Sequence, residues 1–297
     1  KKSLKPKIIS SNLITKIDKT GLGKGRVLGT LVYDGNIYIA FHASENNCKN
    51  LKVEFAKINE KYLNFENFFN SEECGDYDLF GGKMQFFEHD KIEGLLLTTS
   101  DISRDKINDD PQNDESIFGK VLFIDFENKN HIIFSKGHRN PAGLYAENNL
   151  ILSTEHGPRG GDEINKIIFN KNYGWPISSY GEKYYVQDNI DPLYKKNHLS
   201  FGFEEPVFSY LAAIGISQII KLPNNFSNLW VDNFIISSLW GRSLYRVKFD
   251  TNYNKVIYSE QILIGQRIRD LKYHNNTNTI FLALEEKGDL GILTKKE

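Results

Sequence analysis

The segment TLVYDGNIYIAF, residues 30–41, sets a pattern that recurs along the chain. Two runs of β-branched and aromatic residues flank Asp34-Gly35-Asn36, and these turn residues tolerate the backbone angles of a tight turn. The pattern predicts a β-hairpin. Four more hairpins of this form are predicted at residues 84–99 around 88–93, 143–154 across Glu147-Asn148-Asn149, 216–239 with a longer turn at 223–228, and 271–284 through 275–278.

The hairpins recur at a nearly regular interval. They begin near residues 31, 84, 143, 216 and 271, so the spacings are 53, 59, 73 and 55 residues, and further short strands follow them. Such a period, built from a few antiparallel strands, is typical of the blades of a β-propeller. We therefore predict an all-β propeller, with an irregular β-sandwich as the alternative. One domain is expected over residues 1–297, with an insertion near residues 170–199.

The composition excludes several broad classes of protein. The 297 residues include 37 Lys and Arg against 38 Asp and Glu, a net charge of −1, which gives no overall reason to bind nucleic acid or an anionic membrane. No run approaches the roughly 18–20 apolar residues of a membrane span.

Cys48 and Cys74 allow one bridge or two free thiols. The first residues hold no signal-peptide core, so an exported protein would have lost its leader before Lys1.

Several familiar catalytic motifs are absent from the sequence. The glycine cluster at residues 21–25 lacks the spacing and the following helix of a phosphate loop, so we interpret it as a turn. The seven histidines include no HxxxH pair, and none has the spacing of a zinc site. No GxSxG segment occurs, which gives an α/β-hydrolase no support.

Residues 137–181 and a pair of arginines beyond them are chemically unusual. Arg139 and Asn140 place a planar cation and an amide just before a proline. The polar loop EHGPRGGDE, residues 155–163, has glycines and a proline that can turn carbonyl oxygens toward a hard cation such as Ca²⁺. Arg267 and Arg269 alternate along a predicted strand, so both point to one face and suit a polycarboxylate. Salt-bridged blade edges are the alternative interpretation.

These motifs resemble those of the soluble pyrroloquinoline quinone (PQQ)-dependent sugar dehydrogenases, the glucose/sorbosone dehydrogenase family of six-bladed β-propellers. The resemblance covers most of the chain and implies a six-bladed ring, of which five hairpins are evident and the first blade is incomplete. The similar segments are GKVLFID at 119–125, GHRNPAGL at 137–144, TEHGPRGGDEIN at 154–165, NYGWP at 172–176 and GQRIRD at 265–270.

The resemblance implies where PQQ binds. The cofactor would lie over the central axis, with its carboxylates held by Arg267 and Arg269. Arg139 and Asn140 would lie near the quinone, and Arg139 is also a candidate for a catalytic role.

The resemblance further implies a calcium ion and a reaction. Ca²⁺ would bridge PQQ to the backbone carbonyls of Gly157 and Pro158 and polarise the quinone. A histidine base would take the proton of the anomeric hydroxyl while hydride leaves C1 of an aldose sugar for the quinone, giving a lactone. The expected partners are the sugar and an electron acceptor, and the expected location is the periplasm or the cell exterior.

The chain departs from the family at the base. The family segment resembles HFGGR, whereas residues 79–83 read LFGGK, with Leu79 at the base position and Lys83 at the arginine position. His42 and His89 would replace the base only if the fold brought them to the axis. A second departure places Trp240 where the family has a lysine, so an aromatic face would stack on the cofactor or pack against the protein.

Three functions are compatible with these observations. The first is a Ca²⁺- and PQQ-dependent aldose dehydrogenase. The second is a catalytically silent propeller that binds a ligand or a protein, motivated by Leu79. The third is a calcium-dependent, lactonase-like hydrolase that uses Glu155, Asp162 and Glu163 around a metal-bound water.

Overall fold

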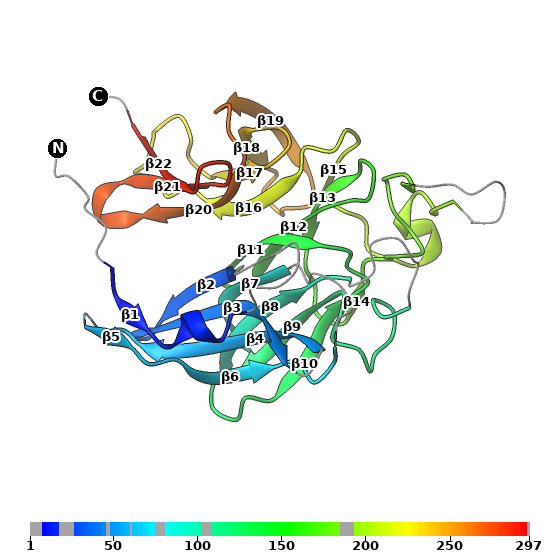
Figure 1. The fold of residues 1–297 in the computed structure, drawn as a ribbon. Helices are drawn as coiled ribbons and strands as arrows, with labels where there is room; N and C mark the ends of the chain where they lie inside the picture. The colour runs from blue at the N-terminus through cyan, green and yellow to red at the C-terminus, as the bar shows by residue number, and fades with distance from the viewer. Residues whose placement is uncertain are drawn as a thin grey trace.

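Short antiparallel strands joined by turns dominate this computed structural model, which describes residues 8–17, 27–45, 48–59, 61–74, 81–101, 109–184 and 193–295. The strands form five sheets that follow one another along the sequence (Figure 1). We number these sheets as blades 1 to 5 from the N-terminus.

The blades have three to five strands each. Blade 1 contains β2 (Val27–Tyr33), β3 (Asn36–Glu45), β4 (Cys48–Lys57) and β6 (Glu66–Asn70). Blade 2 contains β7 (Gly81–His89), β8 (Ile92–Thr99), β9 (Lys120–Asp125), β10 (His131–Lys136) and β14 (Lys171–Asn172). Blade 3 contains β11 (Pro141–Glu147), β12 (Leu150–Glu155), β13 (Asp162–Lys166) and β15 (Phe208–Tyr210).

The last two blades are formed by the C-terminal third of the chain. Blade 4 contains β16 (Ile216–Lys221), β17 (Asn233–Ser238), β18 (Ser243–Phe249) and β19 (Val256–Leu263). Blade 5 contains β20 (Ile268–His274), β21 (Thr279–Leu284) and β22 (Asp289–Thr294). Outside the blades, β1 (Ser10–Ser11) pairs with β5 (Tyr62–Leu63), and 3₁₀ turns lie at Leu13–Thr15, His198–Phe201 and Asn275–Thr277.

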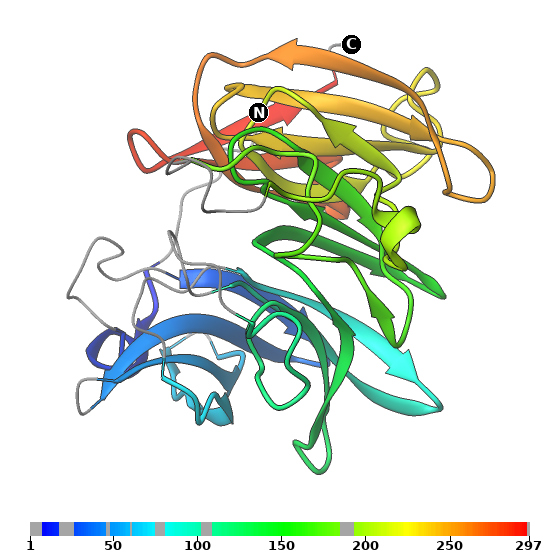
Figure 2. The same cartoon turned by 90° about the vertical axis from the view of Figure 1, so that its right-hand side faces the viewer.

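The first strand of each blade faces the centre of the ring. β2, β7, β11, β16 and β20 belong to successive blades, and β7, β11 and β16 each contact the first strand of the blade before and after them. Figure 1 shows these strands on the inner side of their sheets, and Figure 2 shows the sheets following one another from blue, through green, to orange. The arrangement confirms the predicted all-β propeller and its five repeats, and the residues that the structure describes build five blades.

The predicted hairpins form the first two strands of every blade. Tyr33 pairs with Asn36, and the two residues between them have positive φ angles of 45° and 70°, which suit the twist of a two-residue hairpin. The predicted turn at 223–228 is shorter than the observed connection, which runs from the end of β16 to Asn233. The connection is longer because Leu222 and Phe226 within it are buried against blade 5.

The hydrophobic core lies between neighbouring blades. Leu31 and Leu97 belong to a cluster shared by blades 1 and 2, and Leu152 and Phe234 to one shared by blades 3 and 4. Blades 2, 3 and 4 therefore bury both faces against their neighbours, and the side chains at the ends of the innermost strands line the centre.

The predicted insertion near residues 170–199 separates the third and fourth strands of blade 3. Its first residues add β14 to blade 2 by parallel pairing with β10. Trp175 donates a hydrogen bond from Nε1 to Asp101 Oδ2 at 2.7 Å, so the insertion ties blade 3 to the neighbouring blade.

Some of the features predicted from the sequence lie in residues that the structure does not describe, and others can be compared with it. The glycine cluster at residues 21–25 and Leu79 lie outside the described residues. Cys74 is disulfide-bonded, and Cys48 is the only other cysteine in the sequence. Within the described ranges, no helix is long and apolar enough to cross a membrane.

Candidate functional site

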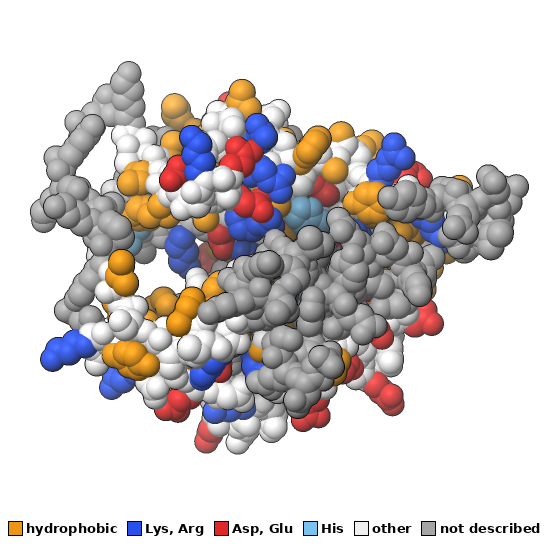
Figure 3. Space-filling model, viewed as in Figure 1, with side chains coloured by type: hydrophobic (Ala, Val, Ile, Leu, Met, Phe, Trp, Pro, Cys, Tyr) orange, Lys and Arg blue, Asp and Glu red, His pale blue; other side chains and the backbone are white. Residues whose placement is uncertain are grey.

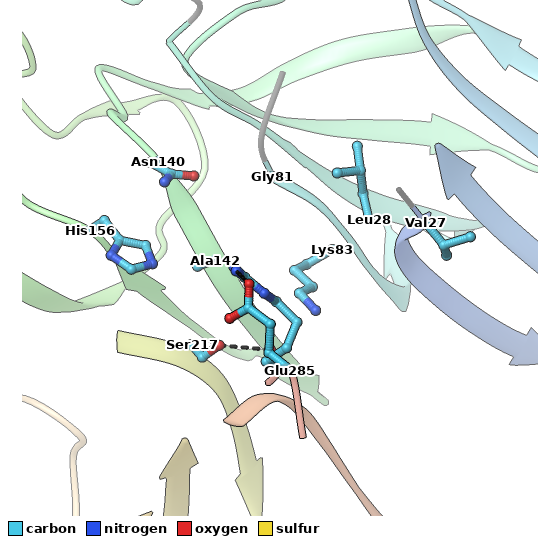
Figure 4. Close-up of a pocket in the computed structure, with 10 residues that line it drawn as sticks. Val27, Leu28, Gly81, Lys83, Asn140, Ala142, His156, Ser217 and Glu285 are labelled. Atoms are coloured by element: carbon cyan, nitrogen blue, oxygen red, sulfur yellow. Dashed lines mark hydrogen bonds and ion pairs between the residues drawn. The ribbon is translucent and has the colours of Figure 1, made fainter. Parts of the chain in front are cut away.

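A cavity of about 230 Å³ lies among the innermost strands of the ring (Figure 4). Its walls come from all five blades, and Figure 3 shows the surface hollowed where blades 1 and 5 face each other. The polar residues that line it are Lys83, Asn140, His156, Ser217, Arg269 and Glu285.

Every innermost strand has a β-bulge at the level of this cavity. The pairing register shifts between Val27 and Gly29, Gly81 and Met84, Pro141 and Gly143, Ile216 and Ile219, and Ile268 and Asp270. A bulge leaves a residue outside the ladder and re-aims its side chain. The residues released in this way that line the cavity are Leu28, Lys83, Ala142, Ser217 and Arg269. The bulges therefore build its wall.

Close approach of the innermost strands requires glycine at two of these bulges. A Cβ atom on Gly29 would lie 2.1 Å from the carbonyl oxygen of Gly82. A Cβ on Gly143 would lie 2.4 Å from the carbonyl oxygen of Ser217. Any larger residue at either position would force neighbouring blades apart and distort the cavity.

The predicted arginine pair meets one carboxylate at the cavity edge. Arg267 Nε donates to Glu285 Oε2 at 3.0 Å, and Arg269 Nη2 donates to Glu285 Oε1 at 2.7 Å. Burial alone would raise the pKa of Glu285, but the hydrogen bonds and charges of Arg269 and Arg267 outweigh it, and the pKa lies below its ordinary value. Arg269 lines the cavity itself, with Arg267 beside it.

Two further polar groups line the cavity: an acceptor oxygen that needs a hydrogen-bond donor, and a cation. Asn140 Oδ1 is buried without a hydrogen-bond partner, a condition that costs about 1–3 kcal/mol unless a ligand or water satisfies it. Lys83, only 5% exposed, donates to Asp270 Oδ2 at 2.5 Å. Lys83 thus places a cation at the cavity wall.

Arg139 lies behind the cavity wall rather than in it. Its Nη1 donates to the backbone carbonyls of Gly157 at 2.8 Å and His156 at 3.1 Å. The guanidinium also lies 5.4 Å from the centre of the Trp175 ring, a cation–π geometry. Arg139 therefore fastens the loop that begins at His156 to the start of β11.

Glu155 organises this region from a buried position. Its carboxylate accepts hydrogen bonds from the backbone N–H of Arg139 and from His138 Nδ1, the latter at 3.0 Å. His138 Nε2 lies 2.8 Å from Ser135 Oγ. The connectivity is that of a hydrolase triad, but Ser135, His138 and Glu155 are 1%, 0% and 4% exposed. No substrate can reach this serine, so the network is structural.

The carbonyls predicted to bind calcium carry protein donors in this structure. Arg139 donates to the Gly157 oxygen, and Tyr184 Oη donates to the Pro158 oxygen at 2.5 Å. Among the described residues, no group of three or more His, Cys, Asp or Glu side chains could hold a metal. Each of the two carbonyls therefore already accepts a hydrogen bond from the protein, and a calcium ion would have to replace or supplement these donors.

The polar loop also fails to form the metal centre that a hydrolase would need. Asp162 Oδ1 accepts from the backbone of Gly157, and its Oδ2 accepts from the backbone of Ile214 and Ile216. These hydrogen bonds fix the loop against blade 4. Burial and the nearby charge of Glu155 raise the pKa of Glu163, which favours its neutral form.

His156 is a site residue that sequence reasoning missed. It lines the cavity, and in Figure 4 its ring points toward the centre. Burial lowers the pKa of His156 to about 4; Asp162 opposes this shift, while Arg139 and Arg269 add to it. The imidazole is therefore neutral near pH 7. The position of His156 in the EHGPRGG segment could have indicated this role, but only the glycines, the proline and the charged residues of that segment were interpreted from the sequence.

Other predicted residues do not join this cluster. Trp240 follows β17 and is 76% exposed, and it is not among the residues that line the cavity; its contact with a cofactor stays a prediction. His42 lies in β3, and His89 at the end of β7 packs against Phe123 and Phe134. Neither histidine lines the cavity, so neither replaces a base there.

A model of the glucose/sorbosone dehydrogenase family matches residues 2–293. The chain belongs to this family. Among curated relatives, the aldose sugar dehydrogenase of Escherichia coli is 30% identical over 205 residues, 68% of this chain and 51% of the relative. Quinoprotein glucose dehydrogenase B of Acinetobacter calcoaceticus is 31% identical over 134 residues, 44% of this chain and 26% of the relative.

Solved structures of glucose/sorbosone dehydrogenases share the fold. One crystal structure of a glucose dehydrogenase has a TM-score of 0.80 at 24% identity and covers 95% of this chain and 85% of its own. The PQQ-bound aldose sugar dehydrogenase of Streptomyces coelicolor has a TM-score of 0.68 at 19% identity, covering 94% and 81%. The chain spans about half the length of the first curated relatives that it matches.

Proposed function

We propose that this glucose/sorbosone dehydrogenase family member oxidises aldose sugars to lactones with PQQ as the hydride acceptor. The observation that carries the proposal is the convergence of Arg269, Lys83 and the unpartnered side-chain oxygen of Asn140 in one cavity at the centre of the blades. Membership of the family supports the same function, as does similarity to an aldose sugar dehydrogenase and a quinoprotein glucose dehydrogenase.

The cations at the cavity are the groups that would bind a flat, anionic quinone. Arg269 and Arg267 would bind carboxylates of PQQ through the donors that Glu285 leaves free, since a guanidinium has five N–H groups. Lys83 adds a third cation at the wall, and Asn140 would be satisfied by a polar edge of the ligand.

Bound PQQ would supply the redox chemistry by accepting hydride from C1 of the sugar. The protein must then take the proton of the anomeric hydroxyl, a task that Leu79 cannot perform. We assign it to a ring nitrogen of His156, because this is the histidine whose ring lines the cavity. Its imidazole is neutral near pH 7, as a proton acceptor must be, although its lowered pKa makes it a weaker base than an ordinary histidine.

Calcium is the second cofactor of the proposal, on the strength of the family resemblance alone. Gly157 and Pro158 would have to lose the hydrogen bonds from Arg139 and Tyr184 before their carbonyls met the ion. We therefore derive no catalytic step through calcium.

A small-molecule sugar and an electron acceptor are the proposed partners, and the periplasm or the cell exterior is the proposed location. The disulfide at Cys74 supports export, because disulfides persist in oxidising compartments and are rare in the cytosol.

The first test is a PQQ titration of the purified protein, followed by quenching of its three tryptophans, with and without Ca²⁺. Saturable binding is expected, and stronger binding with Ca²⁺ would support the proposed metal. A folded sample that binds no PQQ under either condition would remove the dehydrogenase proposal.

Restoring the family's histidine is the second test. Leu79→His should increase dye-linked sugar oxidation of the PQQ-loaded protein, because the lowered pKa of His156 makes it a weak base and the variant would add a second histidine. No gain over the wild type in a folded, loaded variant would count against the proposal.

A catalytically silent binding propeller is the second candidate, and the substitution at Leu79 favours it. PQQ or sugar binding without turnover, by both the wild type and Leu79→His, would support this candidate. Robust sugar oxidation by the wild type would exclude it.

A further inference from the structure

Glu285 is an acidic residue at a cavity that otherwise suits an anion. It directly follows β21, and its backbone N–H donates to the carbonyl of Arg267 at 2.9 Å. Its carboxylate lines the cavity and bonds both Arg267 and Arg269. Figure 4 shows the carboxylate pointing into the cavity toward Ala142. A fixed protein carboxylate therefore stands where a carboxylate of a bound anion would meet the two guanidinium groups.

The charges around the cavity show the consequence of this placement. Lys83 is paired with Asp270, and Arg267 and Arg269 share Glu285. These five side chains carry a net charge of +1, from three cations and two anions. This net charge of +1 is too small to neutralise a ligand with several carboxylates. The negative charge of Glu285 already neutralises one of the positive charges that such a ligand needs.

We propose that Glu285 is an internal competitor that limits the affinity of the arginine pair for polycarboxylates. It holds the pair in place when the cavity is empty, and an incoming carboxylate must share or displace it. For PQQ as the ligand, this inference rests on the proposed function; for polycarboxylates in general, it rests on the geometry alone.

The test is the affinity of Glu285→Gln for two anions, PQQ and benzene-1,3,5-tricarboxylate, measured by calorimetry or tryptophan quenching at low and physiological salt. Glutamine keeps the size of the side chain and one oxygen acceptor but removes the charge. The substitution removes one negative charge that contacts the two arginines and is partly screened by solvent. We therefore expect Glu285→Gln to bind both anions roughly tenfold more tightly than the wild type. The gain should shrink as salt screens it.

Glu286→Gln is the matched control. Glu286 is the next residue, is ion-paired with Arg242 at 2.8 Å, and does not line the cavity. Its substitution should leave both affinities unchanged. Thermal melting of both variants verifies that each is folded, and Glu285→Ser provides a second, smaller neutral residue.

The two anions separate this inference from the proposed function. Tighter binding of the tricarboxylate to Glu285→Gln, with no PQQ binding to any form, would support the competitor and reject PQQ as the ligand. Equal or weaker binding of both anions to Glu285→Gln and Glu285→Ser, or an equal gain in Glu286→Gln, would overturn the inference. If neither the wild type nor any variant binds either anion, the inference is also overturned, because the arginine pair would then bind no anion even without the negative charge of Glu285.

Discussion

Sugar oxidation by the PQQ-loaded protein should fall by about 10²–10⁴-fold in kcat when His156 is replaced by glutamine. The expected loss is confined to kcat, because glutamine keeps a hydrogen-bonding group at the cavity while removing the proton acceptor. PQQ affinity, measured by tryptophan quenching, should change little. Steady-state kinetics with a dye acceptor would measure both KM and kcat.

His274→Gln is the control for this substitution, since His274 lies at the end of β20, is exposed and does not line the cavity. It should retain full activity. Introducing Leu79→His into the His156→Gln variant should restore part of the lost turnover by returning a base to the family's position. Full activity of His156→Gln alone would mean that another group takes the proton.

The free energy of unfolding should fall by about 3–5 kcal/mol when Glu155 is replaced by leucine. The substitution leaves the N–H of Arg139 and the ring of His138 without their acceptor in a region that is almost fully buried. Each buried donor without a partner costs about 1–3 kcal/mol. Urea or thermal unfolding followed by circular dichroism would measure the change.

Two comparison variants make this result specific to the buried network. Glu155→Gln retains an acceptor oxygen and should lose less stability than the leucine variant. Glu182→Leu removes a carboxylate that is 60% exposed and paired with Lys196, so it should cost under about 1 kcal/mol. Equal losses from Glu155→Leu and Glu182→Leu would show that the buried hydrogen bonds contribute nothing measurable.

The hairpin pattern and the motifs were sufficient to predict the fold and part of the site. Turn residues such as Asp34 and Gly35 act locally, so their effect on the chain direction is visible in the sequence. Arg267 and Arg269 were predicted to share a face as alternate residues of one strand. In the structure Arg267 precedes β20 and Arg269 lies at its β-bulge, and the two meet because both bind Glu285.

The partners of these residues could not be predicted in the same way. Glu285 and Lys83 reach the cavity from the ends of different blades, and His156 reaches it from a loop. The bulge that turns Lys83 inward depends on the pairing of β7 with β8, in which Gly81 faces Thr99 and Met84 faces Leu97, and no local pattern displays this pairing. For the same reason, the hydrogen bonds that occupy the carbonyls of Gly157 and Pro158 were not foreseen.

The sequence alone determined that this protein is a β-propeller and which family it resembles, because strand alternation, turn chemistry and short motifs are properties of neighbouring residues. Tertiary structure decided which side chains meet at the centre and what charge they have together. A ring brings residues from five separate segments into one cavity, and hydrogen bonds, ion pairs and pKa values depend on distances between those segments rather than on spacing within any one of them.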